Sequence, residues 1–174
     1  EDIDNVKTDI NKINSDVAGL KNFTDDAFAD GVVDRGEASA IGAYLKSIAT
    51  VKADVDKSYT EVYANPLLAG TAKTTLNTTY TAFGKAVEEL TTVIEAVVEK
   101  GIADATDRAS VNGKYDAFNT KYGAFIAALN AANTYIQDQI ESKAENALTE
   151  AVSYRYLKKA FSEYTIIEGG LVQN

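Results

Sequence analysis

Apolar side chains recur along most of the chain at alternating steps of three and four residues. This spacing returns a side chain to the same side of an α-helix about every seven residues, so each run predicts an amphipathic helix. Four runs show the spacing, at residues 3–20, 41–62, 76–97 and 111–140. The pattern therefore predicts an all-α protein that is built from long helices.

The first run has the narrowest apolar seam. Between its apolar positions nearly every residue is Asp, Asn, Lys, Ser or Thr. A helix with so narrow a seam is marginal in water without a partner. We therefore expect residues 1–24 to form a coiled-coil-like helix that self-associates. The seam consists of Ile3, Val6, Ile10, Ile13, Val17 and Leu20.

The other three runs are predicted to pack together. Because the connections between them are short, consecutive helices should run antiparallel. We expect an elongated antiparallel three-helix bundle within residues 25–160. The stripes are Ile41, Leu45, Ile48, Val55, Tyr59 and Val62, interrupted by Lys52; Leu76, Tyr80, Phe83, Val87, Leu90, Ile94 and Val97; and Val111, Tyr115, Phe118, Tyr122, Phe125, Leu129, Ile136 and Ile140.

Turn and capping residues predict where these helices begin and end. Pro66 disfavours helical geometry in the residue before it, so the first bundle helix should end near Asn65. Thr71 is a candidate N-cap for the next helix, and Gly101 is a candidate C-terminal stop. The last helix should be capped by one of two residues, Asp104 or Thr106.

The end of the chain has a different pattern. Residues 164–167, Tyr-Thr-Ile-Ile, are typical of a short β-strand, and Gly169 and Gly170 should stop it. We therefore expect residues 161–174 to be an extended, β-like linker into a β-rich region outside this sequence. Because Glu1 is not a start methionine, we also expect this chain to be part of a longer protein.

A weak internal repeat relates two helix starts. The residues of each pair lie 71 positions apart, and Gly31 lies near Gly101 in the same alignment. Two interpretations stay open, a duplication and a shared helix-start chemistry. The pairs are Ala38 with Ala109, Ser39 with Ser110, Gly42 with Gly113, and Tyr44 with Tyr115.

Composition removes many kinds of chemistry. The chain has no Cys, His, Met or Trp, which argues against thiol and histidine catalysis and against zinc sites. A net charge of -9 argues against nucleic-acid binding. No run approaches the roughly 18 apolar residues that span a bilayer. The sequence predicts a protein that is not an enzyme, has no cofactor and does not insert into membranes.

One loop carries a candidate metal site. Asp26, Asp30, Asp34 and Glu37 match positions one, five, nine and twelve of a calcium-binding EF-hand loop. Phe28 occupies position three, where an oxygen ligand is expected. The alternative needs no metal, because Asp34 and Glu37 also form a capping box at the start of a helix. Calcium binding, if present, should be weak.

Two further side-chain groups invite a functional interpretation. The carboxylate pairs Glu88 with Glu89 and Glu95 with Glu99 resemble acid and base pairs, but a solvated helix face accounts for them better. The tyrosines are typical of sugar-stacking surfaces, but most fall on the apolar stripes, so packing with hydroxyls at the rim is the better account.

Two runs of residues form an ordered set of motifs: residues 30–38, Asp-Gly-Val-Val-Asp-Arg-Gly-Glu-Ala, and then Asp56, Lys57, Tyr59, Val62, Tyr63 and Asn65 followed by Leu68, Gly70 and Thr71. This order of motifs resembles the helical segments of phage and prophage tail-fibre and tail-tip proteins. The resemblance implies a structural spacer in a virion tail or prophage-encoded particle, often trimeric, with other tail proteins as partners. It also implies a distal receptor-binding region. The alternative classes are a spacer or ligand-binding module of a bacterial cell-surface protein and a weak calcium-binding module.

Overall fold

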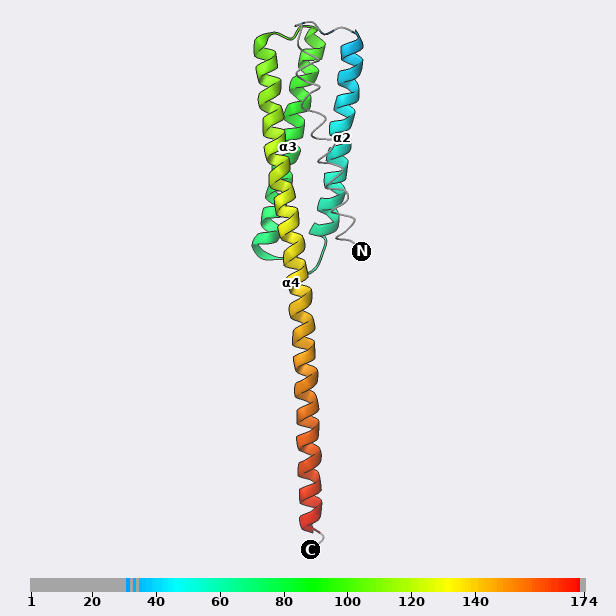
Figure 1. The fold of residues 1–174 in the computed structure, drawn as a ribbon, viewed down its shortest axis with the longest axis vertical. Helices are drawn as coiled ribbons and strands as arrows, with labels where there is room; N and C mark the ends of the chain where they lie inside the picture. The colour runs from blue at the N-terminus through cyan, green and yellow to red at the C-terminus, as the bar shows by residue number, and fades with distance from the viewer. Residues whose placement is uncertain (1–30, 32, 34, 173–174) are drawn as a thin grey trace. The chain divides into compact units, whose positions relative to one another are not determined.

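The structure is a computed structural model. It describes residues 31, 33 and 35–172, without the side chains of residues 35 and 160–172. The elements are α2 (Arg35–Tyr63), α3 (Gly70–Lys100) and α4 (Ala105–Val172), shown in Figure 1. The prediction of an all-α protein is confirmed for this part of the chain. The predicted coiled-coil helix at residues 1–24 lies outside the described residues.

The chain divides into two compact units, residues 1–134 and 135–174. The first unit contains α2, α3 and the first part of α4. Its core is made of side chains that are at most 2% exposed, and all three helices contribute to it. The largest are Ile41 and Ile48 from α2; Leu76, Phe83, Leu90 and Ile94 from α3; and Phe118, Phe125 and Leu129 from α4.

Helices α2 and α3 lie side by side and run in opposite directions. Near the end of α2, the ring of Tyr59 stacks on that of Tyr80 in the first half of α3, with centroids 3.8 Å apart. At the start of α2, Ala38 and Ile41 lie across from Val98 near the end of α3. The tight connection through Pro66 makes this reversal possible, since α2 ends at Tyr63, close to the predicted end near Asn65.

The first part of α4 packs on α3 through aromatic rings. The Phe83 ring of α3 lies 5.4 Å from that of Phe118, 5.8 Å from that of Tyr122 and 6.4 Å from that of Phe125. Tilted and offset ring pairs at these distances add roughly 0.5–1.5 kcal/mol each to the effect of burial alone. This aromatic cluster lies at the centre of the first unit's core, as the stripe of residues 111–129 predicts.

Backbone geometry confirms two of the predicted helix ends and corrects a third. Gly101 adopts φ 69° and closes α3, because its N–H donates to the carbonyls of Val97 and Val98. Asp104 caps α4, with its Oδ1 accepting from the N–H groups of Thr106 at 2.8 Å and Asp107 at 2.9 Å. These bonds decide between the two caps predicted for the last helix.

Thr71 is not the N-cap of α3, so that prediction was wrong. The helix begins at Gly70, and the preceding Ala69 is extended and makes no side-chain capping bond. Gly70 adopts φ 59°, which glycine tolerates, and the helix starts two residues earlier than it would with Thr71 as its cap.

The two glycine loops aligned by the weak repeat lie next to each other. The N–H of Ala103 donates to the carbonyl of Gly31 at 3.0 Å, and the N–H of Val33 donates to the carbonyl of Gly101 at 3.2 Å. Ala103 is fully buried beneath this pairing. The loop before α2 is therefore fastened to the loop between α3 and α4 by two backbone hydrogen bonds.

The predicted β-strand at residues 164–167 was wrong, because α4 continues through it to Val172. Thr165, Ile166 and Ile167 favour strands only weakly, since β-branched side chains cost a helix a few tenths of a kcal/mol each. Extending a formed helix is easier than starting a new element. The predicted stop at Gly169 and Gly170 also lies within α4.

Candidate functional site

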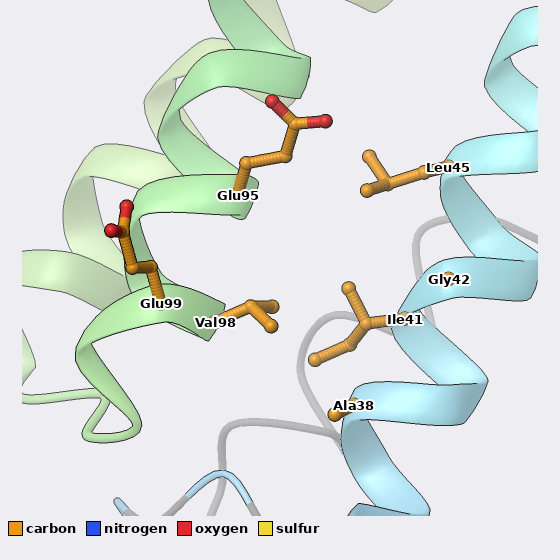
Figure 2. Close-up of a pocket in the computed structure, with 7 residues that line it drawn as sticks. All are labelled: Ala38, Ile41, Gly42, Leu45, Glu95, Val98 and Glu99. Atoms are coloured by element: carbon orange, nitrogen blue, oxygen red, sulfur yellow. The ribbon is translucent and has the colours of Figure 1, made fainter.

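One concave surface of the first unit is an apolar groove between α2 and α3. It has a volume of about 340 Å³ and is open to solvent. Figure 2 shows Ile41 of α2 pointing across the groove toward Val98 of α3, and Leu45 pointing across it nearer to Glu95. We call this surface the α2–α3 groove, and it is lined by Ala38, Ile41, Gly42, Leu45, Glu95, Val98 and Glu99.

The lining of the groove suits an apolar side chain better than a reacting substrate. Its floor is aliphatic, and its polar groups are the carboxylates of Glu95 and Glu99, both on exposed positions of α3. A volume of this size is at the lower end for small-molecule pockets. The groove can therefore take up a small apolar group beside a negative rim, which is the chemistry of weak binding.

A polar cluster joins α2 to α3 farther along the same pair of helices. The Nζ of Lys52 lies 2.6 Å from Oδ1 and 2.8 Å from Oδ2 of Asp56. The hydroxyl of Tyr80 donates to Oδ1 of Asp56 at 2.9 Å, and that of Tyr59 donates to Oδ1 of Asn77 at 2.8 Å. We call these residues the Lys52–Asp56–Tyr80 cluster, with the Tyr59–Asn77 pair beside it.

The cluster has the electrostatics of a structural clamp. Partial burial raises the pKa of Tyr80, and its hydrogen bond to the Asp56 carboxylate raises it further. A phenol held in its neutral form is a poor base and a good hydrogen-bond donor. Lys52 also lies 5.4 Å from the centre of the Tyr80 ring. The ammonium, carboxylate and hydroxyl of this cluster bind one another. This arrangement favours a role in holding two helices together over a role in catalysis.

Sequence reasoning missed this cluster because Lys52 looked like an interruption of the apolar stripe. A signal was present, since Lys52 and Asp56 are four residues apart and such pairs face each other on a helix. The partner on the next helix, Tyr80, was expected in the stripe and is half-buried. Its hydroxyl reaches the rim as predicted for the tyrosines.

The carboxylate pairs are not brought together as acid and base partners. Glu89 accepts a hydrogen bond from Lys114 at 2.9 Å, and this bond lowers the pKa of its carboxyl group. A general acid needs the opposite shift. Glu88 is exposed and points away from the core, as expected for a solvated helix face.

The calcium candidates are mostly outside the described residues. Asp26, Asp30 and Asp34 lie outside the described residues, while Glu37 lies in the first turn of α2. Among the described residues, no group of three or more acidic side chains is placed to hold a metal ion. The site thus stays a prediction, which titration of millimolar calcium into the metal-free protein tests by the heat released.

Two findings concern the class of protein. Within residues 35–172, no helix is long and apolar enough to cross a bilayer. No family model, curated protein or solved structure matches the chain.

Proposed function

We propose that this chain is a non-catalytic spacer module of a phage or prophage tail appendage, which positions a distal receptor-binding region. One observation carries the spacer role. Residues 135–172 are helical throughout, a rod of about 57 Å at about 1.5 Å per residue, and the side chains of residues 140–159 are exposed. An exposed helical rod of this length sets a distance between what lies at its two ends. The assignment to a tail appendage rests on the resemblance of residues 30–71 to tail-fibre and tail-tip proteins.

The proposal includes an elongated antiparallel three-helix bundle in the first unit. Its support is the stacking of Tyr59 on Tyr80 between α2 and α3 and the Phe83 cluster between α3 and α4. Residues 1–24 would add self-association through their apolar seam, as a trimer if the resemblance extends to assembly, and other tail proteins would bind at either end. The location would be the virion tail.

Immunogold electron microscopy tests the location. Antibodies raised against the purified chain are applied to particles and to intact cells of the producing strain. Gold at the tail tip or fibres supports the proposal. Gold on the cell surface, with none on particles, would refute it in favour of the bacterial surface module.

The α2–α3 groove is the observation that favours this second candidate, a ligand-binding module of a bacterial surface protein. Its aliphatic floor offers a place for an apolar group, with Glu95 and Glu99 at the rim. Substituting Leu45 with Ala should weaken the binding of any ligand that enters the groove, whereas a spacer would keep its function. Ligand retention on the purified chain, followed by mass spectrometry, separates the two roles.

A further inference from the structure

The second unit carries large apolar side chains on the surface of a helix. Ile140 is 51% exposed, Leu148 is 67% exposed and Tyr154 is 68% exposed. Every described side chain from residue 140 to 159 is exposed. Large apolar side chains exposed along one helix are candidates for an interaction surface.

These side chains share one face of α4. Ala144, Ala147, Ala151 and Tyr154 follow one another at steps of three, four and three, which is the spacing of a coiled-coil seam. Ile140 lies one turn before them, and Leu148 flanks them. The opposite face carries the polar residues Asn146, Thr149 and Ser153 together with two exposed apolar side chains, Tyr156 at 72% and Leu157 at 56%. We call Ile140, Ala144, Ala147, Leu148, Ala151 and Tyr154 the α4 seam.

The charges beside the α4 seam indicate what covers it. With Ala144 and Ala151 at position a, Glu150 occupies position g and Arg155 occupies position e of the following heptad. In a parallel, in-register pair, position g of one helix faces the next position e of its partner. Glu150 then meets Arg155 of a second copy, twice by symmetry. An antiparallel pair brings g to g and e to e, and forms neither contact.

We propose that the α4 seam pairs with the α4 seam of a second copy as a parallel, in-register coiled coil. Small alanines at the a and d positions let the two helices approach closely, and Leu148 packs over the edge of the contact. This goes beyond the proposed function, which places self-association in residues 1–24. It holds or fails independently of the particle that carries the chain.

Cysteine crosslinking of the whole chain tests the pairing and its register. The chain contains no cysteine, so a single introduced thiol reports one position. In a parallel in-register pair, Ala147→Cys places two thiols within reach of a disulfide, whereas Thr149→Cys, the matched control on the face opposite the seam, holds them apart. We expect at least ten-fold more covalent dimer from A147C than from T149C under mild oxidation. Equal yields, or no dimer from A147C, would overturn the proposal.

Charge exchange tests the partner side chains. Glu150→Lys makes both flanking positions basic, and Arg155→Glu makes both acidic, while neither residue belongs to the buried core. By sedimentation equilibrium, each variant alone should dimerise at least ten-fold more weakly than the original chain. An equimolar mixture should recover the affinity. Circular dichroism checks that both variants keep their helix.

The outcomes separate this proposal from self-association elsewhere. A chain that dimerises through residues 1–24 alone would be insensitive to both charge changes, which would overturn the pairing of the α4 seam and leave the spacer role standing. A mixture that binds no more tightly than either variant alone would overturn the parallel register.

Discussion

At the scale of single residues, two tyrosine hydroxyls of the first unit illustrate opposite contributions to stability. Tyr80 uses its hydroxyl to reach Asp56 across two helices. Tyr122 is 4% exposed, and within the described residues its hydroxyl has no hydrogen-bond partner. Burial, with the nearby charge of Asp54, raises the pKa of Tyr122. One hydroxyl therefore stabilises the fold, and the other costs stability.

Removing each hydroxyl should have opposite effects. Tyr80→Phe loses a hydrogen bond to a carboxylate, so the free energy of unfolding should fall by about 1 kcal/mol. Tyr122→Phe removes an unsatisfied buried group, and the free energy of unfolding should stay unchanged or rise by up to about 1 kcal/mol. Urea unfolding followed by circular dichroism measures both. A loss of equal size in the two variants would show that Tyr122 has a partner after all.

The capping residue of α4 predicts a response to acid. Its carboxylate accepts from the backbone N–H of Asp107, the ammonium of Lys100 and the backbone N–H of Thr106, and these bonds lower the pKa of Asp104 from 3.8 to about 2. The unfolded chain binds this proton at higher pH than the folded chain does. The stability from Asp104 is therefore complete above about pH 4 and is lost as the pH falls toward 2.

Two substitutions separate capping from charge at this position. Asp104→Asn keeps an oxygen for the N–H groups but has no proton to gain, so the melting temperature should depend less on pH between 4 and 2. Asp104→Ala removes the cap and should lower the melting temperature at neutral pH. Thermal unfolding across pH 2–7 measures both. If the melting temperature of the Asp104→Asn variant depended on pH as steeply as that of the original chain, this account would be contradicted.

At the scale of helices, the sequence predicted the existence of α2, α3 and α4 but placed one face imperfectly. The buried side of α2 is Ile41, Tyr44, Ile48, Val51, Val55, Ser58 and Val62. The predicted stripe used Leu45 and Tyr59 in place of Tyr44 and Ser58. At each of these two places, two adjacent residues could occupy the buried position, Tyr44 or Leu45 and Ser58 or Tyr59. Packing against α3 and α4 decides which of the two is buried.

The candidate site was less predictable than the helices. The α2–α3 groove depends on which side chains of two helices face each other, and helical spacing does not contain that information. The prediction of a β-strand at residues 164–167 was wrong because it considered the residue types alone and not the helix that precedes them. Helix ends were more predictable, since Gly101 and Asp104 act within their own turn.

Glycines at helix ends and in helix interiors should respond oppositely to alanine. Gly101→Ala forces a side chain into φ 69° and should lower the free energy of unfolding by about 1 kcal/mol. Gly113 lies inside α4, with no heavy atom within 4 Å of an added Cβ. Gly113→Ala should therefore raise the free energy of unfolding by roughly 0.5–1 kcal/mol. Chemical unfolding compares the two, and a gain from both would refute the cap at Gly101.

At the scale of the whole molecule, the two units should contribute differently to unfolding. The described buried side chains all belong to residues 41–136, and the last of them is Ile136. A chain ending at residue 139 should therefore keep the cooperative transition of the first unit, with a melting temperature at low concentration within about 4 °C of the full chain's.

Concentration distinguishes a rod that stands alone from one that pairs. If the α4 seam joins two copies, folding of residues 140–157 is linked to association, so the melting temperature of the full chain should rise with protein concentration. The shortened chain lacks the α4 seam, and its melting temperature should rise less. If the melting temperature rose equally steeply with concentration in both chains, association would occur through another surface, because the shortened chain lacks the α4 seam. Because pairing also holds both rods in register, the same contact that stabilises the second unit would keep the two copies of residues 140–157 parallel.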